Sequence, residues 1–328
     1  MTNLTRKPEA IAKLVRESQR IALCCHVNPD GDTLGSALAL RLGLIALGKD
    51  VEVFCQDKTP DSLYMLPGID TVRLPEEAQG RFDLLLSIDV SDEKRMGRCT
   101  GLMSLADRTA QIDHHGTNPC FMQVNSVDAY VPATAVLIKQ QLDVLGVTVT
   151  PEMAMCLYTG ISTDTGNFAF VSTSAETFAI MAELMACGLP LAQMNRLLFR
   201  QREKAQVQLL NRALSTLTFH EHECITMMTL TQQDFADCGA LPEHADTVVN
   251  FGLDIAGVKM SALLRETADG KVKVSFRAVE PARVDKAAAS FGGGGHAQAA
   301  GATVDGTIND AKAQVLAALC RALNEDNE

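Results

Sequence analysis

An apolar run leads directly into a loop crowded with histidine and aspartate at residues 21–32, which read Ile21-Ala22-Leu23-Cys24-Cys25-His26-Val27-Asn28-Pro29-Asp30-Gly31-Asp32. The run has the length and apolar character of a buried strand. Two further segments repeat the arrangement, since Phe82–Ile88 ends at Asp89 and Thr109–Ile112 ends at Asp113-His114-His115. Open parallel sheets bind ligands beyond the carboxyl ends of their strands. We therefore expect the three polar clusters to share one crevice.

Short strand-like runs alternate with longer amphipathic segments through the first 190 residues. Thr33–Leu47 and Pro132–Leu145 have helical patterning, whereas Val51–Cys55 has the character of another strand. This alternation predicts an α/β fold in which helices flank a parallel sheet.

The pattern changes in the last third of the chain. Residues 191–217 are rich in Leu, Gln, Arg and Ala and contain no proline or glycine, which predicts one long helix between two domains. Beyond it, Lys271–Arg277 alternates with a period of two after an Asp269-Gly270 turn signal. The sequence therefore predicts an N-terminal α/β domain at 1–190, a linker helix at 191–217 and a smaller α+β domain at 218–328.

Size and composition are those of a globular protein in a reducing compartment. With 328 residues and 47% hydrophobic content, the chain can bury a full core. No apolar stretch reaches the ~20 residues of a membrane span, so we expect no membrane association and a cytoplasmic location. The ten cysteines are scattered without a Cys-x-x-Cys pair, which favours free thiols.

The charge balance limits the substrates that the protein can bind. A formal net charge of −11 has the wrong sign for gripping long duplex nucleic acid through a basic surface. An anionic substrate would have to be held locally, by metal ions and a few arginines.

The residues at the strand ends have the chemistry of a metal site. Imidazole and carboxylate ligands without thiolate favour Mn²⁺, Mg²⁺ or Fe²⁺ over structural zinc. Several carboxylates in one cleft repel one another unless divalent cations neutralise them, which favours two ions. Asp89, alone at its strand end, is the residue that we expect to bridge both. The candidate set is His26, Asp30, Asp32, Asp89, Asp113, His114, His115 and Asp164.

Each piece also has a simpler interpretation. Asn28–Asp32 fits an ordinary turn in which Asp32 caps a helix that begins at Thr33. Asp113-His114-His115 on its own fits a solvated loop. Their joint placement at strand ends is what favours a metal site.

Four motifs together resemble the DHH phosphoesterase superfamily, in particular its nanoRNase and pAp phosphatase branch. They are His-x-x-Pro-Asp-x-Asp at 26–32, Asp89, Asp-His-His at 113–115 and Thr-Asp-Thr-Gly at 163–166. The segment Gly292–Gly301 resembles the glycine-histidine signature of the associated DHHA1 domain. The likeness covers nearly the whole chain, and it implies a parallel-sheet DHH domain followed by a DHHA1 domain.

The resemblance also implies roles for the site residues. It assigns one Mn²⁺ to His26, Asp30 and Asp89, and a second to Asp32, Asp89, His114 and Asp164. Asp113 would orient a neighbouring histidine. His115 would protonate the leaving oxygen or bind the phosphoryl oxygens, unless it only packs the loop.

The C-terminal domain is expected to bind the substrate. The glycine run lets backbone N–H groups approach an anion closely, so Gly293, Gly294, Gly295 and His296 would form a phosphate-binding nest. A flexible linker is the alternative. Arg277 would be an ordinary exposed arginine by its pattern, but the family pattern implies that it meets the substrate phosphate, with Arg265 assisting.

The activity implied is Mn²⁺-dependent hydrolysis of very short single-stranded RNA, together with dephosphorylation of 3′-phosphoadenosine 5′-phosphate (pAp). A homodimer is implied as well. Two alternatives stay open: hydrolysis of cyclic di-AMP or its linear product, and, from another class, a nucleotide sensor without catalysis.

Overall fold

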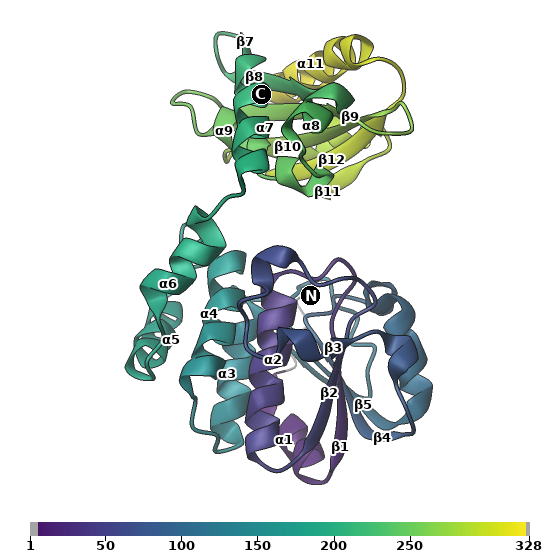
Figure 1. Ribbon diagram of the computed structural model, residues 1–328, viewed down its shortest axis with the longest axis vertical. Coiled ribbons are helices and arrows are strands. Elements are labelled where there is room, and N and C mark those ends of the chain that lie inside the picture. The colour runs from purple at the N-terminus through teal and green to yellow at the C-terminus, as the bar shows by residue number, and fades with distance from the viewer. Residues whose placement is uncertain (1–5, 326–328) are drawn as a thin grey trace. The chain divides into compact units, whose positions relative to one another are not determined.

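The computed structural model describes residues 6–325, and the chain divides into two compact units, Met1–Gln201 and Arg202–Glu328 (Figure 1). Each unit is built on its own six-stranded sheet and has its own hydrophobic core.

The sheet of the first unit is entirely parallel, as the sequence predicts, with strand order β3-β2-β1-β4-β5-β6. The order reverses at β1, whose neighbours are β2 and β4, and such a switch point opens a crevice at the carboxyl ends of the strands. The strands are β1 Arg20–Cys24, β2 Asp50–Phe54, β3 Val72–Arg73, β4 Phe82–Ile88, β5 Ala106–Asp113 and β6 Val124–Val127.

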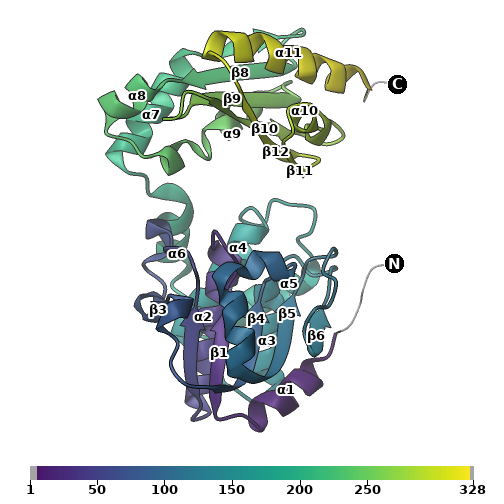
Figure 2. The ribbon, with the colours of Figure 1, turned by 90° about the vertical axis from the view of Figure 1, so that its right-hand side faces the viewer.

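Helices cover both faces of this sheet. On one face α2, α3 and α4 lie side by side, as Figures 1 and 2 show, and their apolar sides bury the larger core. On the other face the 3₁₀ segment η4 (Glu93–Leu105) packs Met96, Cys99 and Leu102 against the strands. The helices are α1 Pro8–Arg16, α2 Gly31–Ala46, α3 Thr134–Val144, α4 Pro151–Asp164, α5 Ala175–Ala186 and α6 Leu191–Asn195.

The predicted linker helix over 191–217 is wrong as a single element. The chain instead forms α6, a π-helical turn at Arg196–Arg200, extended backbone at Gln201 and Glu203, and then α7. Met194 is buried in the core of the first unit, whereas Leu209 is buried in the second unit. The two halves of the segment pack on different cores, and this packing overrides a local sequence that would continue the helix.

The second unit carries a mixed sheet with strand order β11-β12-β10-β9-β8-β7, in which only β8 and β9 pair in parallel. The turn signal at Asp269-Gly270 joins β9 to β10, an antiparallel hairpin as predicted. The strands are β7 Thr218–His220, β8 Ile225–Leu230, β9 Met260–Glu266, β10 Val272–Ala278, β11 Gly294–His296 and β12 Ala299–Val304. The helices are α7 Lys204–Ser215, α8 Gln232–Cys238, α9 Val248–Leu253, α10 Asp285–Ala289 and α11 Ile308–Glu325.

Within residues 6–325, no single helix has both the length and the apolarity to cross a membrane. Only the pair formed by α5 and Leu191–Arg200, bent by 118°, meets both conditions together.

Glycines let α2 and α4 approach closely beneath the strand ends. A Cβ at Gly35 would collide with the carbonyl oxygen of Cys156, and a Cβ at Gly160 would lie 2.6 Å from Oδ1 of Asp32. Because both obstacles are held in place by helices, the approach requires glycine at these two positions.

We predict that Gly35→Ala lowers the free energy of unfolding by about 1–3 kcal/mol, because overpacking against fixed backbone outweighs the better helix propensity of alanine. Urea unfolding followed by circular dichroism measures the change. Gly101→Ala is the matched control, since Gly101 has open space where the Cβ would lie, and it should change stability by less than about 0.5 kcal/mol. Equal stability of the two variants would contradict this account of the packing.

Candidate metal centre

Asp30 begins both a helix and the polar cluster after β1. Its Oδ1 accepts hydrogen bonds from the backbone N–H groups of Asp32 (3.0 Å) and Thr33 (3.1 Å), so Asp30 is the N-cap of α2. The alternative in which Asp32 caps this helix is therefore wrong. The other oxygen of Asp30 lies 3.4 Å from Nε2 of His26. One carboxylate thus starts the helix and faces the imidazole.

His26, Asp30 and Asp89 form the first group of potential metal ligands. Nε2 of His26 is 3.6 Å from Oδ2 of Asp89, so the imidazole nitrogen faces both carboxylates. Its other nitrogen, Nδ1, lies 2.8 Å from the carbonyl oxygen of Val27. When Nδ1 carries the proton, Nε2 presents a lone pair to the space between the two carboxylates.

Asp32, His114 and Asp164 form a second group. Nε2 of His114 lies 3.3 Å from Asp164, 4.0 Å from Asp32 and 3.6 Å from Oδ1 of Asp89. The structure therefore brings together all six residues that the sequence predicts as metal ligands. Asp89 is shared, because its Oδ2 faces the first group and its Oδ1 faces the second.

Asp32 is held by the start of a different helix. It is fully buried, and its oxygens accept hydrogen bonds from the N–H groups of Thr134 (2.6 Å) and Ala135 (2.9 Å) and from Oγ of Ser36 (3.1 Å). Helix N-termini favour negative charge, so α3 stabilises this carboxylate.

Thr134 is a site residue that the sequence analysis missed. Besides its backbone contact with Asp32, its Oγ1 donates to Oδ1 of Asp89 at 2.8 Å. Thr134 therefore holds two carboxylates in place, Asp32 through its backbone and Asp89 through its side chain. Its position in the first turn of a predicted helix was the available signal, but helix starts rich in threonine are too common to single it out.

Asp113 and His115 form a separate hydrogen-bonded pair beside the ligands. Nδ1 of His115 lies 2.7 Å from Oδ1 of Asp113, and Oδ2 of Asp113 accepts from Nδ2 of Asn118 at 2.5 Å. The buried Asp113 thus orients the imidazole. Nδ1 of His115 is also 3.7 Å from Asp89, but this nitrogen is already engaged by Asp113. The part of the ring that remains is available to a substrate.

Opposite charges compensate one another in this cluster. Burial lowers the pKa of His26, but hydrogen bonds to Asp30 and Asp89 outweigh burial and raise that pKa to about 10. The pKa of His114 also rises to about 10, because its carboxylate neighbours outweigh burial. Burial would raise the pKa of Asp89, yet its contacts with the histidines lower it to about 2. The negative charge of Asp89 is therefore stabilised by positively charged histidines next to both of its oxygens.

The donor set fits divalent cations. Burial, together with the charges of Asp89 and Asp164, raises the pKa of Asp32, so the carboxylates cannot all ionise without compensating positive charge. Oxygen and imidazole donors without thiolate suit Mn²⁺ or Mg²⁺. Metal binding would displace the protons that otherwise supply the compensation on His26 and His114.

In the second unit, Arg277 and His296 fall on one row of the sheet. Arg277 of β10 pairs with Ala299 of β12, and Ala299 pairs with His296 of β11. Paired residues project on the same face of a sheet, so the guanidinium and the imidazole flank a small alanine. Nη1 of Arg277 donates to the carbonyl of Phe276 at 2.9 Å, and burial lowers the pKa of Arg277.

The structure bears on two expectations for this unit. Gly294, Gly295 and His296 form an exposed edge strand, and the N–H group of Gly293 donates to the carbonyl of Ala288. Gly292 and Gly295 have the positive φ values, 70° and 148°, that the predicted nest uses. An edge strand also presents free N–H groups along one side. Arg265 does not fit an assisting role, because it is buried and its two terminal nitrogens donate to the carbonyl of Pro242 and to the carboxylate of Asp246.

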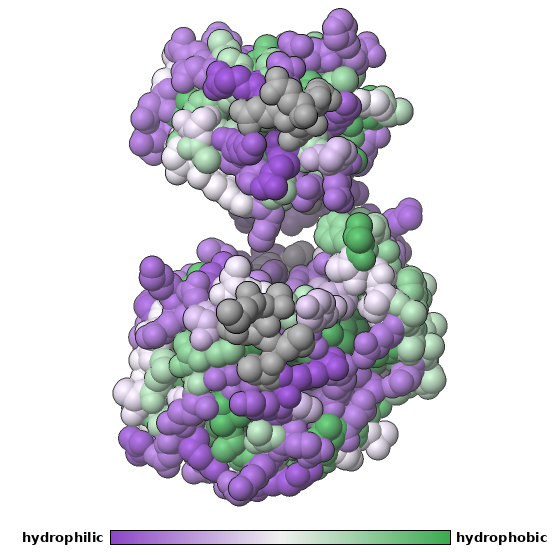
Figure 3. Space-filling model, turned by 180° about the vertical axis from the view of Figure 1, so that it is seen from behind, coloured by the Kyte–Doolittle hydropathy of each residue, from purple (hydrophilic) through white to green (hydrophobic). Residues whose placement is uncertain are grey.

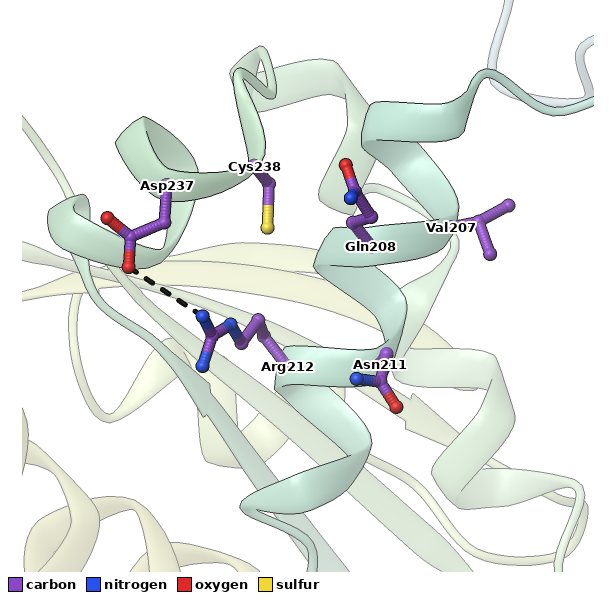
Figure 4. Close-up of a pocket in the computed structure, with 6 residues that line it drawn as sticks. All are labelled: Val207, Gln208, Asn211, Arg212, Asp237 and Cys238. Carbon is purple, nitrogen blue, oxygen red and sulfur yellow. Dashed lines mark ion pairs between the residues drawn. The ribbon is translucent and has the colours of Figure 1, made fainter.

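A shallow concavity lies between α7 and α8, away from this row (Figure 4). Its one guanidinium, Arg212, turns toward Asp237 at 3.7 Å, and its remaining lining includes the amides of Gln208 and Asn211. It presents no group of metal ligands among the described residues.

The comparisons with known proteins agree with this geometry. The model of the DHH family, N-terminal domain, matches residues 20–161, and the model of the DHHA1 domain matches residues 228–325. A Thermus thermophilus protein named bifunctional oligoribonuclease and PAP phosphatase NrnA is 36% identical over 301 residues, which cover 91% of this chain and 89% of that protein. This chain belongs to the DHH family.

Solved structures share the fold of this chain. An exopolyphosphatase-related protein of Bacteroides fragilis is 26% identical and superposes with a TM-score of 0.91 over 98% of this chain and 97% of its own. RecJ of Thermus thermophilus, solved in complex with Mn²⁺, is 19% identical with a TM-score of 0.57, over 98% of this chain and 56% of its own. The second likeness shows the shared fold alone.

We predict that Thr134→Val lowers the affinity of the DHH domain for Mn²⁺ about 10- to 100-fold, because Asp89 loses the donor that fixes its orientation. Calorimetric titration with Mn²⁺ measures the effect. Thr159→Val is the control, since the Thr159 hydroxyl bonds only a carbonyl of its own helix. If both variants bound Mn²⁺ like the wild type, Thr134 would have no role at the centre.

Proposed function

We propose that this DHH-family hydrolase uses two divalent cations, with Mn²⁺ preferred, to cleave very short single-stranded RNA to mononucleotides and to remove a phosphate from pAp. The observation that carries the proposal is the position of Asp89, which belongs to the group with His26 and Asp30 and also lies 3.6 Å from His114 of the second group. The name of the Thermus thermophilus relative supports the substrates, and the RecJ structures solved with Mn²⁺ and with Mg²⁺ support a divalent cation.

His26, Asp30 and Asp89 would hold one cation, and the other would lie among Asp32, Asp89, His114 and Asp164. When bound, two such cations activate water and neutralise the phosphoryl oxygens during in-line displacement at phosphorus. The protein contributes the fixed geometry, in which Asp89 cannot turn away from either group while Thr134 donates to it.

His115 is proposed to protonate the leaving oxygen. Its Nδ1 is held by Asp113, so Nε2 is the nitrogen that can reach a substrate, and the side chain is 35% exposed. Burial lowers the pKa of His115, but the hydrogen bond to Asp113 and the charges of Asp113 and Asp89 outweigh burial and raise it. A protonated imidazole beside the cleaved bond gives its proton to the departing oxygen, and the side chain is then a neutral imidazole.

Arg277 and His296 are proposed to bind a phosphate of the substrate from the DHHA1 domain. They lie on one row with only Ala299 between them, and no carboxylate of residues 6–325 forms a direct ion pair with Arg277, although Asp246 attracts its charge from further away. A guanidinium binds phosphate bidentately, and the free edge of β11 adds backbone N–H donors. Two isolated side chains such as Arg277 and His296 can hold one phosphate of a short substrate. A long strand would need a continuous basic track along its backbone.

A cytoplasmic homodimer completes the proposal. Phe178 and Met185 on α5 are 56% and 46% exposed, and Figure 3 shows hydrophobic side chains gathered where α5 and α6 lie. This surface supports association between copies of the chain.

We predict that Asp89→Asn abolishes turnover, with a loss greater than the roughly 100-fold typical of residues that only support a ligand. The amide cannot provide an anionic bridge, although it preserves the shape of the side chain. Asp83→Asn is the control on the same strand, where Asp83 accepts from Gln19 and Arg20 at the far end of the sheet. Activity of Asp89→Asn equal to that of the control would reject the two-metal scheme.

We further predict that the Mn²⁺-loaded wild type hydrolyses a 5′-phosphorylated dinucleotide and pAp faster than cyclic di-AMP. Initial rates at equal substrate concentrations separate the possibilities. Dominant cleavage of cyclic di-AMP would replace the proposed substrates with the cyclic dinucleotide. If the protein bound the dinucleotide, pAp and cyclic di-AMP tightly without hydrolysing any of them, it would be a nucleotide sensor and not an enzyme.

A further inference from the structure

Arg95 is anchored beside the metal centre by its main chain. It lies in the first turn of η4, shortly after Asp89 at the end of β4. Its N–H group donates to Oδ1 of Asp92 at 3.1 Å, and its carbonyl accepts from the N–H group of Val27 at 2.8 Å. Val27 directly follows His26, so η4 and the first ligand loop are joined at this residue.

The guanidinium of Arg95 lies against the imidazole of His26, a residue of the first ligand group. Its Nη2 lies 3.1 Å from Nδ1 of His26, and the residue is half-buried. No carboxylate within residues 6–325 forms an ion pair with it. Arg98, three residues further along and beyond the kink at Gly97, is exposed and yet pairs with Glu76 at 3.2 Å and donates to the carbonyl of Gln56 at 2.8 Å. A half-buried guanidinium ordinarily has such partners.

The contact with His26 does not satisfy this guanidinium once His26 binds a cation. The nitrogen that faces Asp30 and Asp89 is Nε2, so ligation leaves the proton on Nδ1, which donates to the carbonyl of Val27 at 2.8 Å. An arginine side chain offers only donors. Arg95 then needs another acceptor, and its main chain is held beside the first ligand loop.

We propose that Arg95 binds the non-bridging oxygens of the phosphate group that reacts at the metal centre. This inference rests on the proposed function and adds a substrate-binding residue to the DHH domain itself. We choose phosphate as the anion because the planar guanidinium can bind two of its oxygens at once. It also explains how a chain with a net charge of −11 holds an anionic substrate against its own carboxylates.

A purely positioning role for Arg95 makes a different prediction. If Arg95 acted only by orienting His26, its removal would weaken Mn²⁺ binding, and phosphate binding would fall as a consequence. If Arg95 contacts the phosphate, its removal weakens phosphate binding while Mn²⁺ affinity is preserved. The two affinities, measured separately, distinguish these roles.

The experiment compares Arg95→Gln and Arg95→Lys with Arg98→Gln, which removes the same charge from the same segment. Calorimetry measures Mn²⁺ affinity, and then the affinity of the Mn²⁺-loaded proteins for inorganic phosphate; KM is measured for pAp. We expect Arg95→Gln to weaken phosphate binding and raise KM about 10- to 100-fold with Mn²⁺ affinity unchanged. Arg95→Lys should lie between, and Arg98→Gln should match the wild type.

Unchanged phosphate affinity in Arg95→Gln, or a parallel loss of Mn²⁺ affinity, overturns the inference. So does a Mn²⁺-loaded wild type that binds no inorganic phosphate. Failure of the proposed function is a separate result: a wild type that turns over neither pAp nor a dinucleotide rejects that function, while the phosphate titration still decides the role of Arg95.

Discussion

The carboxylate of Asp89 presents its two oxygens to two different imidazoles, with 3.6 Å between Oδ2 and His26 and 3.6 Å between Oδ1 and His114. The side chain is buried, and the hydroxyl of Thr134 fixes Oδ1, so it cannot rotate to favour one side. Its backbone lies in the left-handed region at φ 60°, which aspartate tolerates better than most residues. Strain at such a position persists where the surroundings hold it in place, as they do here.

The same carboxylates that face the centre also begin the helices around it. Asp30 caps α2, and Asp32 on α2 accepts the first N–H groups of α3. Gly160 on α4 leaves room for Asp32, so three helices meet at one buried carboxylate. Fold and site are therefore coupled. Loss of Asp32 would remove a charge from the centre and also leave the start of α3 without its acceptor, which costs about 0.5–2 kcal/mol for ordinary helix caps.

The sequence was sufficient for those features that depend on local pattern. Strands that end in polar residues predicted the parallel sheet and the joint position of residues such as His26, Asp89 and His114, because carboxyl ends of parallel strands meet at one edge. Thr134 and Arg95 were not predictable in this way. Their roles depend on which helix start meets which loop, and neither residue type is distinctive at its position.

Register and tertiary packing account for the other differences. The row that joins Arg277 to His296 depends on the pairing of β10, β12 and β11, which a glycine run does not specify. The break between α6 and α7 arises because Met194 and Leu209 belong to different cores. No feature of residues 191–217 taken alone would end the helix, since they contain neither proline nor glycine.

The central claim is that Asp89 is shared between two cations, and anomalous diffraction from crystals grown with Mn²⁺ tests it most directly. The account predicts two anomalous peaks about 3.5–4 Å apart, each bound by one oxygen of Asp89. A single peak, or two peaks of which one lies out of reach of Asp89, would contradict it.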